Sequence, residues 1–209
     1  MRRLLSITVL ILTIGVGGFI NGNVRAAADS QISSATLASI RQMLTAPDNG
    51  VFFELWSVDD IVQACIELYY NDPPTAEYHN RVVNGAVILL GETGDPRAVP
   101  VLIDAINTHG PQALYALGNF PTVEALNALV DNVRNDDPSN RENAAEGLRR
   151  MQAPSDGIPD GWVQALENAV EKVGEWVPLE PDASLIDYFA DAHTNVKKLL
   201  EQARAVQGE

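Results

Sequence analysis

The chain has little of the chemistry that metal and thiol sites require. It contains one cysteine and three histidines in 209 residues. A single cysteine excludes a disulfide within the chain, and Cys65 lies on an apolar helical face, which is typical of a small core residue rather than a nucleophile. His79, His109 and His193 are far apart and form no His-x-x-x-His pair, so the sequence predicts no zinc site.

Catalytic motifs are also missing. There is no Gly-x-Ser-x-Gly elbow, phosphate-binding loop or Gly-x-Gly-x-x-Gly fingerprint. Residues 156–162 imitate the second half of a calcium loop, but Gln152, Pro154 and Val163 stand where ligands are needed. We interpret this segment as a turn in which Asp160 caps the next helix. The sequence therefore predicts a protein that is not an enzyme and holds neither a cofactor nor a metal.

Basic residues are few. The chain has 14 Lys and Arg against 28 Asp and Glu, a net charge of −14. This charge repels nucleic acid and anionic lipid, so we expect a protein partner, with a basic surface as the best match. The simpler alternative is that the carboxylates only keep the protein soluble.

The N-terminus has the layout of a signal peptide over residues 1–28. Arg2 and Arg3 precede an apolar run over residues 4–20, and Ala26-Ala27-Ala28 offers a cleavage site. We expect residues 29–209 to be exported as one domain, periplasmic or extracellular, with 11 basic and 28 acidic residues and a net charge of −17. An uncleaved leader that serves as an anchor is the alternative.

Residues 84–106 predict two antiparallel helices joined by a short elbow. The first helical pattern stops at Gly91, and Gly94 then turns the chain. Asp95 can cap the second helix, with Pro96 at its first position. The apolar stripe of that second helix consists of Val99, Leu102, Ile103 and Ile106.

This stretch resembles the HEAT-like repeats, in particular the short bacterial type found in phycobilin lyases. The resemblance lies in Leu-Gly, then Gly-Asp-Pro-Arg-Ala-Val-Pro, then Leu-Ile over residues 90–103. It implies an all-α fold, a short solenoid of antiparallel helix pairs. It also implies that Asp95 and Arg97 fix the elbow and bridge neighbouring units, and that Pro100 bends the second helix.

Weaker copies of the unit follow. Leu117-Gly118 repeats Leu90-Gly91 after 27 residues, as expected for stacked units. The predicted repeat units are residues 79–107, 111–134 and 139–174. A further helix over about 182–206 is expected to fold back on the last unit or to project from it, and residues 37–44 and 58–70 are an upstream candidate pair.

The second helices of such units line up along one side of a solenoid, which the resemblance implies is the binding side. We predict that their polar faces bind a protein partner, so that the protein is an exported adaptor or scaffold. These faces hold Asp104, Asn107, Glu124, Asn127, Asp131, Gln164, Glu167 and Glu171. A solvated outer face without a binding role is the alternative.

Two other functions and one other binding site remain open. One is a cofactor-handling, lyase-like protein or enzyme auxiliary, since a fold does not determine a function. Another is an envelope assembly factor that keeps its leader as an anchor. Aromatic residues near the ends are expected to pack as caps, but an exposed Phe53 or Trp56 would move the binding site to the N-terminal end.

Export predicts a mature chain that begins near Asp29, because signal peptidase cleaves after small residues such as those at 26–28. Cell fractionation with intact-mass spectrometry of the purified protein measures this directly. A chain that retains Met1 in the cytoplasmic fraction would contradict export, whereas a full-length chain in the membrane fraction would indicate an anchor.

Overall fold

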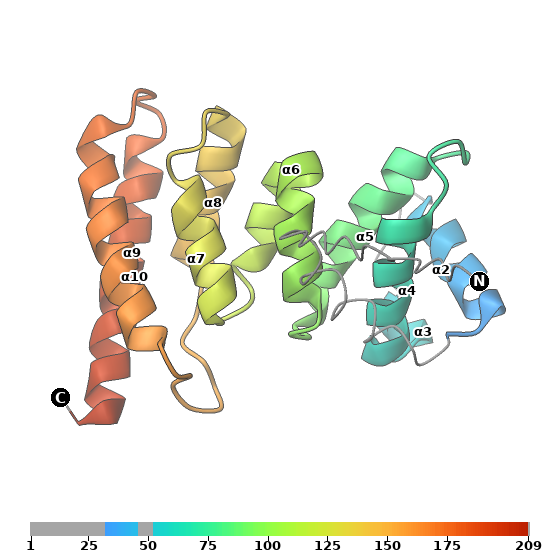
Figure 1. Cartoon of the computed structure of the whole chain (residues 1–209), viewed down its shortest axis with the longest axis horizontal. Coiled ribbons are helices and arrows are strands. Elements are labelled where there is room, and N and C mark those ends of the chain that lie inside the picture. Colours follow the sequence, from blue (N-terminus) through green and yellow to red (C-terminus); the bar gives the residue numbers. More distant parts are fainter. Residues whose placement is uncertain (1–31, 46–51, 209) are drawn as a thin grey trace, which may run out of the picture.

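The computed structural model describes residues 32–45 and 52–208, and every regular element in those ranges is helical (Figure 1). The α-helices are α2 Ser34–Leu44, α3 Phe52–Leu55, α4 Val58–Asn71, α5 His79–Thr93, α6 Ala98–Leu117, α7 Val123–Asn132, α8 Pro138–Arg150, α9 Trp162–Trp176 and α10 Ile186–Gln207, and a 3-10 turn spans Val177–Leu179. The prediction of an all-α fold is confirmed. The predicted signal peptide lies outside the described residues.

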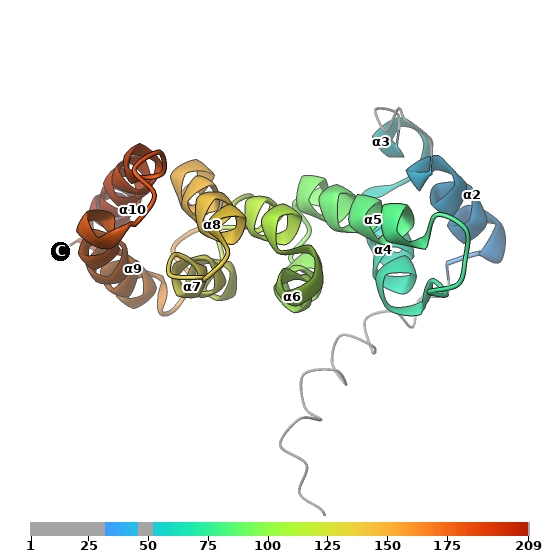
Figure 2. The ribbon, with the colours of Figure 1, turned by 90° about the horizontal axis from the view of Figure 1, so that it is seen from above.

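The helices stack in two layers along one axis (Figures 1 and 2). One layer holds α4, the first part of α6, α7 and α9, and the other holds α5, the second part of α6, α8 and α10. Contacts run between successive elements, and the buried apolar side chains form a continuous core between the layers. This arrangement is a short α-solenoid, as predicted. No helix in the described ranges has the length and apolar character needed to cross a membrane.

Helix α6 belongs to two units because it kinks in its middle. His109 has φ −136° and ψ 41°, two residues before Pro111, which lacks the amide hydrogen that a helix interior needs. The helix therefore bends at His109, and the prediction of a bend at Pro100 is wrong. Pro100 is the third residue of α6, where the backbone amide has no partner within the helix, so a proline there removes no hydrogen bond.

The elbow differs from the prediction at its first glycine. Helix α5 continues past Gly91 to Thr93 and ends at Gly94, which has φ +67°, a conformation that favours glycine. Gly91 lies inside the helix, so the expectation that the helix ends there, with the positive φ that favours glycine, is wrong. It is needed for space instead: a Cβ atom at Gly91 would lie 2.5 Å from Cβ of Ala116 in α6.

Asp95 and Arg97 hold the elbow and join two units. The Asp95 carboxylate accepts from the Arg97 backbone amide at 2.9 Å and from its guanidinium at 2.7 Å. Arg97 also donates to Asp59 of α4 at 2.7 Å. Because the Asp95 side chain bonds two residues ahead, Pro96 and Arg97 form a turn and the helix begins at Ala98, later than predicted. Hydrogen bonds from Arg97 lower the pKa of Asp95.

Other helix starts divide into those with and without side-chain caps. Ser57 accepts from the amide of Asp60 ahead of α4, and Asp137 accepts from the amide of Ser139 ahead of α8. The capping role expected for Asp160 is wrong. Gly161, with φ +77°, precedes α9 and no side chain caps that helix.

The C-terminal helix α10 folds back against α8 and α9, and it begins later than the predicted residue 182. A buried ion pair secures the connection that leads into it. Arg141 of α8 donates from Nε and Nη2 to the two oxygens of Glu180, each at 3.0 Å, and Trp176 donates to Glu180 at 3.0 Å. Residues 182–185 are occupied by a turn in which Asp182 accepts from the amide of Ser184.

Aromatic side chains pack at both ends of the stack. Phe189 of α10 is buried in the core, and Phe52 packs on Trp56 with ring centroids 5.9 Å apart. Trp56 is partly buried against the core, but Phe53 is 45% exposed. The condition stated for a binding site at the N-terminal end is therefore met by Phe53 and not by Trp56, so this end is an alternative binding site.

We predict that Gly91→Ala lowers the free energy of unfolding by about 1–3 kcal/mol, because the new methyl group overlaps Ala116. Removing the opposing methyl group with Ala116→Gly should relieve this overlap. Urea denaturation of both single variants and the double variant would then give a coupling energy of about 1 kcal/mol or more. Strictly additive effects would show that the two helices are not in this close contact.

We also predict that Glu180→Gln destabilises the protein by about 3 kcal/mol, because it leaves the buried Arg141 guanidinium without a charged partner. Burial raises the pKa of Glu180, but hydrogen bonds from Arg141, Asp182 and Trp176 outweigh it, so the net pKa is lowered. This contribution is present above the unfolded-state pKa of about 4.3 and is lost as pH falls through the lower folded-state value.

The measurement is urea denaturation from neutral to acidic pH. The difference between wild type and Glu180→Gln should shrink as the pH falls. The exposed Glu201→Gln on α10 is the matched control and should change stability by less than about 0.5 kcal/mol. A difference that is constant down to low pH would contradict the ion pair.

Candidate functional site

The eight residues predicted to bind a partner lie on α6, α7 and α9, three neighbouring helices of one layer (Figure 2). We call the outer side of these helices the α6–α7–α9 surface. Asp104, Asn107, Glu124, Asp131, Gln164 and Glu171 are exposed, whereas Asn127 and Glu167 are half-buried. Their role in binding stays a prediction.

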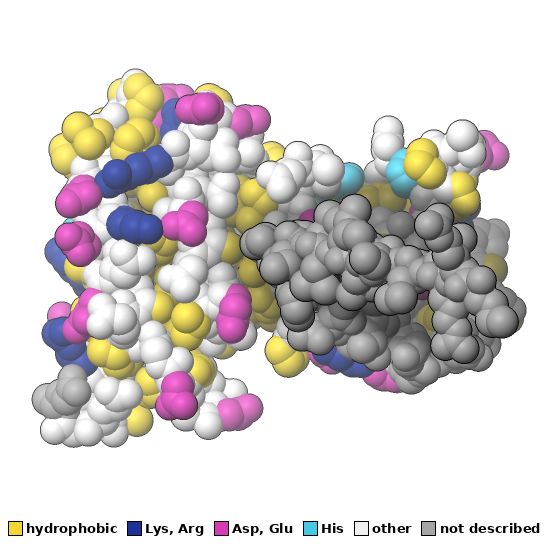
Figure 3. Space-filling view, in the orientation of Figure 1, with side chains coloured by type: hydrophobic (Ala, Val, Ile, Leu, Met, Phe, Trp, Pro, Cys, Tyr) yellow, Lys and Arg dark blue, Asp and Glu magenta, His cyan; other side chains and the backbone are white. Residues whose placement is uncertain are grey.

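Basic side chains lie among the acidic side chains of this surface and pair with two of them. Lys172 of α9 donates to Asp131 of α7 at 3.1 Å, and Arg204 of α10 donates to Glu167 at 2.5 Å. Figure 3 shows Lys and Arg side chains among Asp and Glu side chains over this end of the molecule. Glu124 and Glu171 are exposed and take part in no ion pair within the described residues. Asp104 is also exposed and outside these ion pairs, so the surface combines two paired carboxylates with three accessible ones.

Asp104 has a different environment from the other carboxylates. It lies beside Tyr69 and Tyr70 of α4, and burial followed by the Asp104 charge raises the pKa of Tyr70 to about 12. Tyr69 packs edge-on to His109, whose pKa is lowered by burial and then by the charge of His79. These tyrosines stay protonated at neutral pH, so the cluster supplies hydrogen-bond donors and no strong base.

The structure places the remaining candidate groups in structural roles. Cys65 is fully buried in the core, and this burial raises the pKa of its thiol, which disfavours the nucleophilic thiolate. The Asp72 carboxylate accepts from Nδ1 of His79 at 2.9 Å and from Nε of Arg41 at 2.5 Å. Within the described ranges, no group of three or more His, Cys, Asp or Glu side chains could hold a metal ion.

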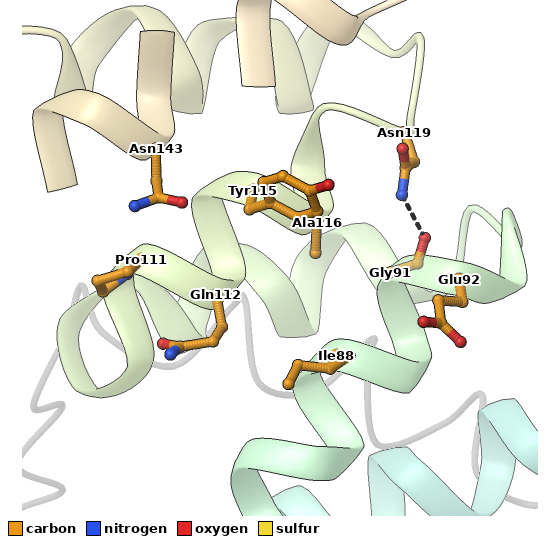
Figure 4. Close-up of a pocket in the computed structure, with 9 residues that line it drawn as sticks. All are labelled: Ile88, Gly91, Glu92, Pro111, Gln112, Tyr115, Ala116, Asn119 and Asn143. Atoms are coloured by element: carbon orange, nitrogen blue, oxygen red, sulfur yellow. Dashed lines mark hydrogen bonds between the residues drawn. The ribbon is translucent and has the colours of Figure 1, made fainter. Parts of the chain in front are cut away.

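A groove on the opposite layer was missed by the sequence reasoning. It has a volume of about 400 Å³ and lies between α5, the second part of α6 and α8 (Figure 4). Ile88 and Tyr115 line it and are 40% and 44% exposed. A signal for it exists in the sequence, because these two residues are separated by the same 27-residue step that relates Leu90-Gly91 to Leu117-Gly118. We call this site the Tyr115 groove.

A chain of interactions holds Tyr115 in place. Asn119 donates to the Gly91 carbonyl at 2.9 Å and accepts from Arg150 of α8 at 3.0 Å. The Arg150 guanidinium then lies over the Tyr115 ring, 4.0 Å from its centroid. An exposed aromatic ring is thus fixed by groups from three helical segments.

Comparison with known protein families identifies part of this stack. Residues 81–149, which hold nearly all of α5 through α8, match the family model described as HEAT repeats. The prediction of HEAT-like repeats is therefore confirmed for residues 81–149. A search of curated proteins finds no match. HEAT repeats are generally protein-interaction modules, and this is the functional information that the match carries.

Proposed function

We propose that this protein is an exported, non-catalytic adaptor or scaffold that binds a protein partner through the α6–α7–α9 surface. The observation that carries the proposal is the HEAT repeat match across the open helix stack. Such a stack presents long surfaces that are built from rigid elements, which suits protein recognition better than the enclosure of a reacting group.

Charge supports a partner with a basic surface. The net charge of −14 attracts cations over long range, and Glu124 and Glu171 present carboxylates that no neighbouring cation neutralises in the described residues. Asp131 and Glu167 contribute less to this field because Lys172 and Arg204 pair with them. The proposed contact is therefore steered by the exposed carboxylates of Asp104, Glu124 and Glu171 and completed by the amides of Asn107, Asn127 and Gln164.

Export is the second part of the proposal. It is supported by the charged, apolar and small-residue segments of residues 1–28. Loss of three arginines on cleavage makes the mature chain more acidic, which strengthens attraction to a basic partner.

A double variant that removes two negative charges, Glu124→Gln with Glu171→Gln, tests the surface. The partner is first captured from the extracytoplasmic fraction with the mature protein and identified by mass spectrometry. We expect the double variant to associate several-fold more slowly and with a weaker salt dependence, with little change in dissociation, because exposed charges steer encounter. Stopped-flow or surface plasmon resonance gives both rates.

The control is Asp187→Asn with Glu201→Gln, which removes the same charge from exposed positions of α10. Asp131 and Glu167 are left intact, because their loss would release Lys172 and Arg204. Equal association rates and salt dependence for wild type and the Glu124/Glu171 variant would show that this surface is only solvated.

A further inference from the structure

The Tyr115 groove lies on the other layer from the α6–α7–α9 surface, so it is a separate feature. Its floor is formed where Gly91 and Ala116 allow α5 and α6 to approach closely, and its apolar walls are Ile88 and Tyr115 (Figure 4). Two large apolar side chains that are each about two-fifths exposed and face one cleft make an apolar site that water fills poorly.

The ring of Tyr115 is ordered before anything binds. The guanidinium of Arg150 stacks on it and is itself held by Asn119. Nη1 of Arg150 is buried and has no hydrogen-bond partner in the described residues, which costs free energy that the stacking arrangement must offset. A fixed aromatic side chain loses little conformational entropy on binding, which is the property of an interface anchor.

The polar edge of the groove suits a peptide backbone. Gln112 is exposed and makes no hydrogen bond within the described part of the chain. Asn143 donates to the Ser139 carbonyl, which leaves its side-chain oxygen free to accept. Amides both donate and accept, so they can pair with the alternating N–H and C=O groups of an extended segment, whereas a helix has already paired those groups internally.

The charges around the groove favour a basic segment. Arg150 keeps its positive charge, but its guanidinium lies over the Tyr115 ring and donates to the neutral amide of Asn119, while Arg149 on the same helix is paired with Glu146 at 2.7 Å. Glu92, which lines the groove, is exposed and takes part in no ion pair in the described residues. The carboxylate available to a ligand is therefore that of Glu92, in a protein of net charge −14.

We propose that the Tyr115 groove binds an extended segment of a partner protein in which a large apolar residue lies next to Lys or Arg. The apolar side chain packs between Ile88 and Tyr115, and the cation pairs with Glu92. The backbone of the segment pairs with Gln112 and Asn143. This inference rests on the proposed protein-interaction function and adds a second surface to it.

The test uses a phage-displayed library of nonapeptides, selected on the wild-type protein without counter-selection on any variant of the groove. Selected peptides are then synthesised and measured by fluorescence anisotropy. We expect enriched sequences that place Leu, Phe or Tyr beside Lys or Arg. Affinity should fall at least about tenfold in Tyr115→Ala and in Ile88→Asp, and about threefold or more in Glu92→Lys.

The matched control is Tyr188→Ala, an exposed tyrosine on α10, which should bind within about twofold of wild type. Thermal melting shows which variants are folded, and Ile88→Asp tests the groove without disturbing Arg150. The proposal is overturned if no selected peptide depends on Tyr115 or Ile88, or if the selected sequences are acidic. A captured partner that is lost by the Glu124/Glu171 variant but retained by Ile88→Asp would keep the proposed function and reject the groove.

Discussion

The close contact between α5 and the second part of α6 determines where the rest of the molecule lies. Gly91 has no side chain, and a Cβ atom there would lie only 2.5 Å from Cβ of Ala116. This approach brings consecutive units together so that each buries its apolar face on the next, since a single helix pair cannot bury both of its faces. The kink at His109 serves the same arrangement, because it lets α6 supply one helix to each of two units.

The same stacking gives the two layers different surfaces. On the layer of α6, α7 and α9, successive helices are linked by ion pairs such as Asp131 to Lys172, which leave a polar face. On the other layer, the short distance between helices leaves the Tyr115 groove, with its ring fixed by Arg150. The proposed protein binding through one or both of these surfaces requires no moving part, because both surfaces are built from packed helices.

The helices could be predicted from the sequence because apolar residues recur at the helical period. Their ends follow from local chemistry, since α5 ends at Gly94, which has a positive φ, and the Asp137 side chain caps the start of α8. Gly91 was misread because a glycine needed for close packing looks the same in sequence as one needed for a positive φ. Pairs such as Glu167 with Arg204 could not be predicted, because their partners come from different helices with no fixed spacing. The Tyr115 groove could have been found from the 27-residue step, which places Ile88 and Tyr115 at equivalent positions.

The central claim is that the chain is a stack whose units are stabilised by their neighbours, and native-state hydrogen exchange of the wild-type protein tests it most directly. Units in the middle of a stack have two neighbours, while those at the ends have one. The account therefore predicts the slowest exchange in α5 to α8, with protection that falls toward α2 and toward the end of α10. Equal protection in all helices, or the greatest protection at the ends, would contradict it.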